Sequence, residues 1–526
     1  MEWRTNALGR KVPVAIEGRK LRPFAGAHAD SSAAGTTGSR RTAGGPSRTP
    51  PGRGAPDKRV ATWDDLLDRM DVRSGQTISF HHHLRDGDAI VNEVVARLAA
   101  RGIRDLTLAT TLFSVHERLL AFIESGVIAR IEGSMYGPVG AACTRGAMRG
   151  LCVLRSHGGR QRAVQDGDLP IDAAFIAAPC ADPFGNANGV FGKSACGPLT
   201  YPVPDSLAAE RVAVITDGLV PFPCSRRSIA GGNVDWVLEV DSIGDSSRIV
   251  SGSTLPPRSP TQLLVAELTA RFIEETGIMR DGFSFQAGAG GISLAAIVFL
   301  AERMRAKGVK ASFAHGGATG ILVRLLEEGL LGSIVDLQSF DLEAVRSCRD
   351  NPRHIESTPF DSYGPRAAGC AANLLDVAIL GATEIDLDFN VNVSTHSDGV
   401  LLHGMGGHAD AAACAGCSII TAPSFRSRIP IVRERVTTVS CPGEVVDVVV
   451  TERGIAVNPR RPDLADRARS AGLPLVDLAR LMADVHEITG VPDEPPFADR
   501  VVALVEWRDG TILDVIRQVA APAPIP

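Results

Sequence analysis

A glycine-rich stretch between an apolar strand-like segment and a long apolar helical segment is the clearest candidate for chemistry in this sequence. It runs from Gln286 to Ile292 and contains Gly288, Gly290 and Gly291. Glycines let a backbone approach a ligand closely, and the free N–H groups at a helix start favour a phosphate, a carboxylate or a developing oxyanion. The glycines alone do not choose among these three ligands.

A dinucleotide site is the main competing interpretation of this stretch. Residues 288–293 supply the first two glycines of the dinucleotide fingerprint, but Ser293 stands at the last position, which calls for Gly or Ala. A phosphate-binding loop at Gly192-Lys193-Ser194 is disfavoured in the same way, because Ala187 replaces the required glycine. Neither nucleotide motif is complete.

A second glycine cluster, Gly404 to Asp410, precedes another apolar helical segment and contains Gly406, Gly407 and His408. These glycines could be tight turns that close a strand–helix connection. They could also form the other side of an acyl-group site.

Histidines and cysteines do not form a metal-ligand pattern in the sequence. His81, His82 and His83 follow a strand-like segment, and alternation along a strand sends His82 to the face opposite its neighbours. Of ten cysteines, the one close pair is Cys414 and Cys417, and no second pair completes a zinc ribbon. We therefore expect no metal, and we expect the cysteines to be small buried side chains.

The elements that must position these residues occur twice along the chain. Hydrophobic periodicity predicts strand, helix, strand and helix at 76–80, 89–100, 106–109 and 117–124, and again at 283–286, 294–306, 311–313 and 322–328. Further on, residues 171–178 align with 375–382 at an offset of 204. The same offset pairs Asp182 with Asp386, Asn186 with Asn390, and Asn188 with Asn392.

This repeat predicts an α/β protein of two similar domains, each with a mainly parallel sheet covered by helices. Parallel sheets bind ligands at the carboxyl ends of their strands. We place the boundaries at 1–30 for an N-terminal arm, 31–58 for a disordered linker, 59–255 for the first domain and 256–526 for the second. The linker assignment rests on its composition of Gly, Ser, Thr, Ala, Pro and Arg.

Composition excludes several classes of protein. The 526 residues are 44% apolar and 22% charged, which is typical of a globular chain. Residues 1–60 carry twelve Lys and Arg against four Asp and Glu, a net charge of +8. Because the whole chain has a net charge of −5, the other residues sum to −13. This acidic body argues against nucleic acid as the main partner. Without an apolar h-region or a clean membrane span, we expect a cytoplasmic protein.

Several motifs together resemble the CoA-transferase superfamily and, within it, the citrate lyase alpha subunit family. The resemblance extends over about residues 59–520 and includes these stretches: Asn6–Arg10, Ser79–His83, Ser156–Arg160, Phe184–Gly189, Gln286–Gly291, Val335–Asp341, Phe389–Val393, Ser397–Gly399, Gly406–His408 and Gly454–Pro459. The fold implied agrees with the two-domain prediction from the repeat.

The resemblance implies an acyl exchange in which an acetyl thioester on an acyl carrier protein and citrate give the citryl thioester and acetate. The implied partners are a beta (lyase) subunit and a gamma acyl carrier subunit within an oligomeric complex. The carrier would supply a CoA-like arm, so this chain would need no organic cofactor. Gly288, Gly290 and Gly291 would then be the oxyanion loop.

Many CoA-transferases use a covalent glutamyl thioester, but the corresponding stretch, Phe313 to Thr319, has no carboxylate. We therefore expect exchange in a ternary complex through a citric–acetic mixed anhydride. Glu384 and Asp398 are low-ranked catalytic candidates. Substrate binding is assigned to two groups of residues: Gly406, Gly407, His408, Asn186 and Asn390, and the possible citrate-binding cations Arg85, Arg324 and Arg426.

Two alternative functions stay open at this point. The same fold would support a CoA-transferase or acyl-CoA hydrolase that acts on free CoA thioesters. The chain could also be a non-catalytic scaffold that positions a lyase and a carrier.

Overall fold

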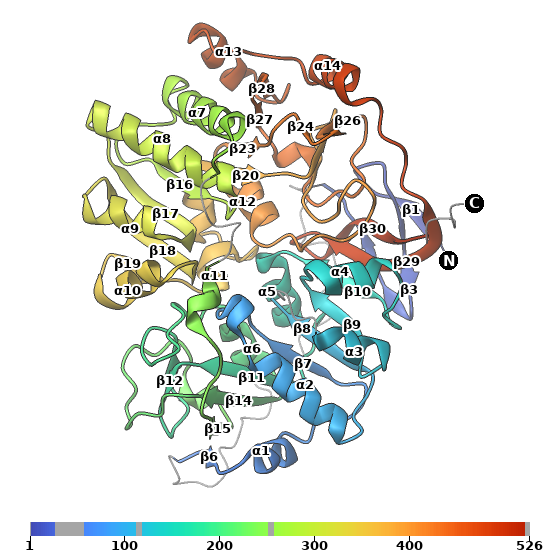
Figure 1. Ribbon diagram of the computed structural model, residues 1–526, viewed down its shortest axis with the longest axis vertical. Helices are drawn as coiled ribbons and strands as arrows, with labels where there is room; N and C mark the ends of the chain where they lie inside the picture. The colour runs from blue at the N-terminus through green and yellow to red at the C-terminus, as the bar shows by residue number, and fades with distance from the viewer. Residues whose placement is uncertain (1, 27–56, 112–117, 251–256, 521–526) are drawn as a thin grey trace.

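The computed structural model describes residues 2–26, 57–111, 118–250 and 257–520 (Figure 1). Two α/β bodies lie one above the other in this view, the first coloured blue to green and the second yellow to orange. Helices α5, α11 and α12 lie between them, where α5 packs against both α11 and α12.

The two bodies are built around sheets whose central strands follow the same order. The first sheet has the order β5 (Arg22–Pro23), β30 (Thr511–Val519), β29 (Phe497–Glu506), β10 (Cys152–Arg155), β9 (Ile128–Gly133), β8 (Leu106–Thr110), β7 (Thr77–Phe80), β11 (Ala173–Ala178), β14 (Arg211–Thr216), β15 (Trp236–Glu239) and β6 (Arg59–Val60). The second has the order β19 (His354–Glu356), β18 (Leu331–Ser339), β17 (Ala311–Ala318), β16 (Ser284–Ala287), β20 (Val377–Gly381), β23 (Ser418–Thr421), β27 (Val448–Thr451) and β28 (Gly454–Val457). Pairing is parallel except at β29–β30 and β27–β28. The predicted fold class is confirmed.

Most of the helices connect successive parallel strands, whereas α7, α13 and α14 lie on the segments that link the two sheets. In the first body they are α1 (Trp63–Met70), α2 (Ile90–Ala100), α3 (Arg118–Glu124), α4 (Gly137–Thr144), α5 (His157–Asp166) and α6 (Pro202–Ala208). In the second they are α7 (Pro260–Glu275), α8 (Gly291–Lys307), α9 (Gly320–Glu327), α10 (Leu342–Asp350), α11 (Pro359–Tyr363), α12 (His408–Cys414), α13 (Pro462–Ser470) and α14 (Leu478–Thr489). Capping sets several ends: the Asp341 carboxylate accepts from Ala344 N before α10, and Gly308 ends α8 with φ +66°.

The paired aspartates and asparagines of the repeat form the same turn in both bodies. In the first, the Asp182 carboxylate accepts from the backbone and amide of Asn186, whose own oxygen accepts from Gly231 N. In the second, Asp386 and Asn390 make the same bonds, and the Asn390 oxygen accepts from Gly443 N. Both amides, assigned to substrate binding from the sequence, are thus used within these turns.

The C-terminal hairpin crosses back to the first body. Strand β29 pairs in parallel with β10 along Cys152 to Arg155, although residues 256–526 were all assigned to the second domain. Its return strand, β30, then holds the N-terminal arm, because Asn6 Nδ2 donates to Ile512 O and Leu513 O and β5 pairs with β30. Except for residues 57 and 58, the expected linker at 31–58 lies outside the described residues.

The apolar core is continuous from one body to the other. One cluster contains the core of the first sheet and also Leu337, Tyr363 and Leu380 of the second body. A separate cluster fills the space around α7 and α8. The boundary between the bodies is therefore a packed interface that can hold residues from both sides in a common site. None of the helices in the described ranges is long and apolar enough to cross a membrane.

Candidate active site between the two bodies

The chain order reverses at the same place in each sheet. Strand β16 lies between β17 and β20 in the second sheet, and β7 lies between β8 and β11 in the first. In open parallel sheets, ligands bind outside the carboxyl ends of the strands at such reversals. The glycine loop at 288–291 follows β16, and the three histidines follow β7, so both occupy these positions.

The loop after β16 is open toward solvent. Gly290 and Ala289 are exposed, and a Cβ added at Gly290 would meet no atom within 4 Å. Gly290 has φ −82° and ψ 146°, which any residue can adopt, so its conformation does not require glycine. The open space beside it is what a bulkier side chain would fill.

One backbone N–H group of this loop is used within the structure, and others are available to bind an anion. Gly288 N donates to Ile379 O at 2.8 Å, so this group already has a partner. Helix α8 begins at Gly291 and extends over 17 residues, and no side chain of the N-cap residue, Gly290, closes its first turn. The first N–H groups of a long helix carry partial positive charge and suit an anion. Gly290 and Gly291 are thus the better donors for an oxyanion.

The second glycine loop lies across the end of β20 from the first. His408 Nε2 donates to Gly381 O at 2.9 Å, directly after β20. Its Nδ1 is then an acceptor and has no hydrogen-bond partner in the described part of the chain. Burial is the main cause that lowers the pKa of His408 to about 4, so the ring is neutral.

Close packing explains the glycines at 404 and 407. A Cβ on Gly404 would lie 2.0 Å from Ser134 Oγ, and one on Gly407 would lie 2.6 Å from Tyr363 Oη. Gly406 O accepts from His157 N of the first body at 2.9 Å. Gly404 and Gly407 thus lie in close packing, and His408 is the residue of this loop with an unpartnered polar atom among the described residues.

The first body provides an aromatic and cationic wall opposite these loops. The Tyr136 ring stacks on His403 at 5.2 Å, immediately before the second glycine loop. Arg85 lies over the Phe340 ring at 5.0 Å, and Phe340 packs against Gly317 at the end of β17. Burial lowers the pKa of Arg85, whereas the electrostatic interaction with nearby Tyr136 partly raises this pKa again. Arg85 is thus a half-buried cation at the interface of the two bodies.

The other two arginines proposed for citrate lie elsewhere. Arg324 is on α9, has a side chain 57% exposed, and lies 3.6 Å from Glu343 on α10. Arg426 donates to Ala382 O at 2.7 Å and lines a separate cavity of about 440 Å³ with Phe425. The structure therefore brings only one of the three predicted cations to the aromatic wall.

His315 lies in β17, within the stretch from Phe313 to Thr319 that contains no carboxylate. Its Nδ1 lies 2.7 Å from Gln286 Oε1, and Gln286 Nε2 donates to Tyr363 Oη at 2.9 Å. The imidazole is 1% exposed, and burial lowers its pKa to about 3. Since Nδ1 is the donor, Nε2 is an acceptor, and it has no partner among the described residues. His315 is therefore a neutral ring with one unpartnered acceptor.

The three histidines after β7 connect the two bodies by hydrogen bonds. Ala177 N donates to His81 Nε2, and His81 Nδ1 lies 2.7 Å from His83 Nδ1. Thr200 N donates to His83 Nε2 at 3.3 Å, and Thr200 Oγ1 donates to Leu337 O in β18.

His82 instead lies 2.5 Å from Thr111 Oγ1 and stacks on Tyr201. All three histidines lie after the end of β7, so alternation along a strand does not apply to them. The two outer rings bond to each other, and the His82 ring stacks on that of His83 at 6.1 Å.

The remaining carboxylate candidates lie away from the glycine loop. Glu384 forms an ion pair with Arg433 and accepts from Asn392 Nδ2 and from Thr437 N, at 2.9 and 2.7 Å. These bonds use most of its acceptor capacity. Asp398 is exposed in a turn, where it accepts from Val400 N.

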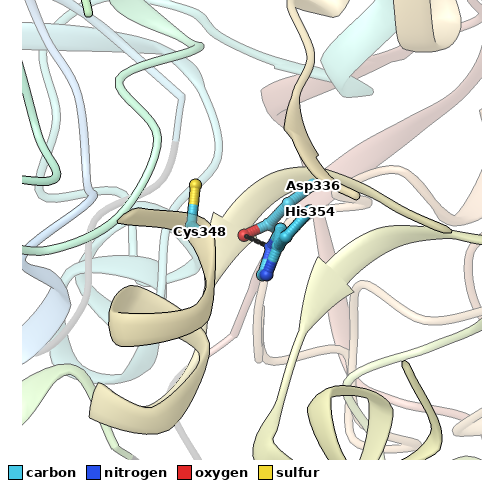
Figure 2. A group of neighbouring side chains, drawn as sticks. All are labelled: Asp336, Cys348 and His354. Atoms are coloured by element: carbon cyan, nitrogen blue, oxygen red, sulfur yellow. Dashed lines mark hydrogen bonds and ion pairs between the residues drawn. The ribbon is translucent and has the colours of Figure 1, made fainter. Parts of the chain in front are cut away.

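Asp336, Cys348 and His354 form the one group of possible metal ligands in the described chain (Figure 2). The Asp336 carboxylate already accepts from His354 Nε2, Ser339 Oγ and two backbone N–H groups. His354 Nδ1 bonds to Ser347 Oγ, and burial raises the pKa of the Cys348 thiol. A metal would have to displace this complete network, so hydrogen bonding accounts for the cluster.

Comparison with known proteins agrees with this geometry. Solved structures with this fold include the alpha subunit of malonate decarboxylase from Acinetobacter baumannii, with a TM-score of 0.60, 16% identity, and coverage of 83% of this chain and 91% of that one. This likeness shows the class of fold: an α/β protein of two similar bodies, each with loops at its strand reversal.

A family model described as "Citrate lyase, alpha subunit" matches residues 57–519. The chain belongs to the citrate lyase alpha subunit family, as the sequence motifs predicted, and is thus one subunit of a larger assembly.

Individual relatives support the same assignment. The citrate lyase alpha chain of Klebsiella pneumoniae is 46% identical to this chain, and the match covers 87% of this chain and 90% of that one. The citrate lyase alpha chain of Escherichia coli is 42% identical, and the match covers 88% of this chain and 91% of that one. A crystal structure of the citrate lyase alpha subunit from Streptococcus mutans in complex with citrate has a TM-score of 0.89. It is 38% identical and covers 98% of this chain and all of that one.

Sequence reasoning did not single out four aromatic residues at the interface. Tyr136, Tyr363 and His403 occur in no recognisable motif, and each acquires a role only through a partner far away in the chain. His157 lay within a stretch that carried the family resemblance, which was the one available signal.

Proposed function

We propose that this chain catalyses the exchange of acyl groups between an acetyl thioester on an acyl carrier protein and citrate, giving the citryl thioester and acetate. The observation that supports this most directly is the open glycine loop at the start of α8 in a citrate lyase alpha chain. The relative from Streptococcus mutans, whose structure contains citrate, adds support for the substrate.

In the first step, a carboxylate oxygen of citrate attacks the thioester carbonyl carbon. Citrate carboxylates are ionised at neutral pH, so the attack needs no general base, in agreement with the neutral rings of His315 and His408. The negative charge that develops on the carbonyl oxygen is stabilised by N–H groups of Gly290 and Gly291. Arg85 offsets part of the charge of the trianion.

The tetrahedral intermediate then collapses with loss of the carrier thiolate and leaves a citric–acetic mixed anhydride. The thiolate attacks the citryl carbonyl of this anhydride, the bond to acetate breaks, and acetate leaves with the electron pair. Each atom of the two substrates is accounted for in the products. Because both steps pass through an oxyanion at the same place, one loop serves both.

The thiol in this proposal belongs to a CoA-like arm on a gamma carrier subunit, so the chain requires no organic cofactor of its own. A beta subunit would cleave the citryl thioester afterwards.

The decisive experiment measures transfer of isotope from labelled acetate into the thioester, with citrate present and absent. A catalytic chain exchanges label, whereas a non-catalytic scaffold does not. Comparing carrier-bound with free CoA thioesters under the same conditions separates the proposed enzyme from an ordinary CoA-transferase or hydrolase. A preference for free CoA would contradict the proposal.

A trapping experiment tests the predicted lack of a covalent intermediate. Because the stretch from Phe313 to Thr319 contains no carboxylate, incubation with an acetyl thioester followed by borohydride should leave activity unchanged. Mass spectrometry should find no modified glutamate. Stoichiometric modification of any glutamate would show that the ternary mechanism is wrong.

A further inference from the structure

A second cavity, of about 380 Å³, lies where the N-terminal arm, the second body and the C-terminal hairpin meet. Its walls come from three distant parts of the chain and comprise Gly9, Arg10, Lys11, Gly399, Arg433, Arg435, Val436, Thr437, Thr438, Glu494, Pro495, Phe497, Asp514, Val515, Ile516 and Arg517. This size is within the range of sites for small molecules and cofactors, and it exceeds what one inorganic anion would fill.

The lining of this cavity is cationic although the whole chain has a net charge of −5. Five basic side chains face two acidic ones, which leaves a local charge of +3. Folded proteins seldom gather like charges in a hollow without a counter-charge, because they repel one another. A bound anion would remove this repulsion.

Two of the five cations already have partners. Arg10 Nε lies 3.5 Å from Asp514 Oδ2, and Arg433 pairs with Glu384. The other three, Lys11, Arg435 and Arg517, are exposed and have no carboxylate within 4 Å in the described part of the chain.

These three come from the arm, the second body and the hairpin. They can therefore contact different oxygens of one ligand.

Much of the remaining wall is apolar, although Thr437 and Thr438 also line it. It includes the ring of Phe497 together with Val436, Pro495, Val515 and Ile516. A small tricarboxylate has no apolar part to place against this wall. A nucleoside phosphate has both parts, since its phosphates suit arginine and its base suits an aromatic or aliphatic surface.

We propose that this cavity binds a nucleoside phosphate, either a free nucleotide or the nucleotide end of a CoA-type thiol. A free nucleotide would be a ligand beyond the exchange reaction, whereas a CoA-type thiol rests on the carrier arm of the proposed function. Gly399 lines the cavity, and His403, which stacks on Tyr136, follows four residues later in the chain. The Cα atoms of Gly399 and His403 are therefore at most about 14 Å apart. A ligand anchored here could therefore extend toward the glycine loops.

Calorimetric titration of the full chain with ADP and with CoA tests the assignment. We expect both to bind at low salt and to bind more weakly at 0.5 M salt, because exposed charges are screened. Arg435→Glu and Arg517→Glu should each weaken binding at least about 10-fold, as loss of one phosphate contact commonly does. The matched control is Lys20→Glu, an exposed charge reversal on the arm outside the cavity, and it should leave affinity unchanged.

The two probes also distinguish a free nucleotide from a CoA-type thiol as the ligand. Binding of CoA more than 10-fold tighter than ADP assigns the cavity to a CoA-type thiol, and equal affinities assign it to a free nucleotide. Three results would overturn the proposal: no binding of either probe, affinities unchanged in both charge-reversed variants, or pyrophosphate binding as tightly as ADP. Labelled-acetate exchange is measured separately, so failure of the exchange reaction would not be confused with failure of this site.

Discussion

At the scale of single residues, the glycines of the two loops have different physical reasons to be glycine. Gly407 has no room for a Cβ because Tyr363 packs against it, which is a requirement of the folded state. Gly290 has room and an ordinary backbone conformation. Its small size therefore matters for what enters the open space, and substitution should separate stability from activity.

Gly290→Val should fold normally and lose activity. We expect a melting temperature within about 2 °C of the native chain, since surface changes without strain usually cost little. Exchange of labelled acetate should fall at least ~10²-fold, the loss typical of removing one oxyanion donor. Turnover and thermal denaturation are measured on the same preparation.

Gly407→Ala is the contrasting control. Its Cβ would lie 2.6 Å from Tyr363 Oη, so the interface must shift and the melting temperature should fall. Near-normal turnover in a folded Gly290→Val protein would mean that the oxyanion is bound elsewhere, with the loop at 404–407 as the next candidate.

At the scale of elements, a buried ion network joins the C-terminal hairpin to the first body. Glu506, at the end of β29, accepts from Arg155 of β10 and from Arg162 of α5, both at 2.9 Å. Burial opposes the charge on Glu506, but the two guanidinium groups outweigh it and hold the pKa of this carboxyl below its usual range. The network ties strand pairing to the helix that faces the second body.

Glu506→Gln should be destabilising because it removes the one carboxylate that Arg155 and Arg162 share, although Arg155 keeps Glu132 and Arg162 keeps two aspartates. Breaking a buried pair completely typically costs about 3–5 kcal/mol, so we expect a smaller loss here, which a shift in the urea midpoint would show. The matched control is Asp350→Asn, which removes the partner of Arg349 from an exposed pair and should leave the midpoint unchanged. Equal midpoints for all three proteins would show that the network does not stabilise the hairpin.

At the scale of the whole molecule, the interface between the bodies contains neutral histidines. Burial lowers the pKa of His81, His157 and His315 to about 3, and places those of His82 and His83 well below the usual value. An unfolded histidine has a pKa near 6.5, so between these values the unfolded chain binds more protons than the folded chain. Stability contributed by neutral burial is therefore complete above pH 6.5 and lost as the pH falls toward 3.

We accordingly expect the free energy of unfolding to drop steeply below pH 6.5. At 1.36 kcal/mol per pH unit, one such histidine contributes a loss of about 2 kcal/mol between pH 6.5 and 5. His315→Gln removes one of these groups, so its destabilisation relative to the native chain should shrink by about that amount over this range. Parallel stability curves for the two proteins between pH 8 and 5 would contradict the assignment of a neutral His315.

The sequence alone determined the features that depend on local pattern. Hydrophobic periodicity predicted strands β7 and β16 and helices α2 and α8 to within a few residues, and the 204-residue offset predicted a duplicated α/β unit. The glycine stretch at 288–291 was found because helix starts and small residues are readable along the chain. Family motifs supplied the class of reaction.

Only the tertiary structure decided what meets across the interface. β29 joins β10 across about 350 residues, and no local signal specifies so distant a strand partner. Arg85 reaches the aromatic wall whereas Arg324 and Arg426 do not, because each side chain's surroundings depend on how the two bodies pack. Sequence pattern sets which elements form. Burial, charge neutralisation and packing between distant elements decide which residues they bring together.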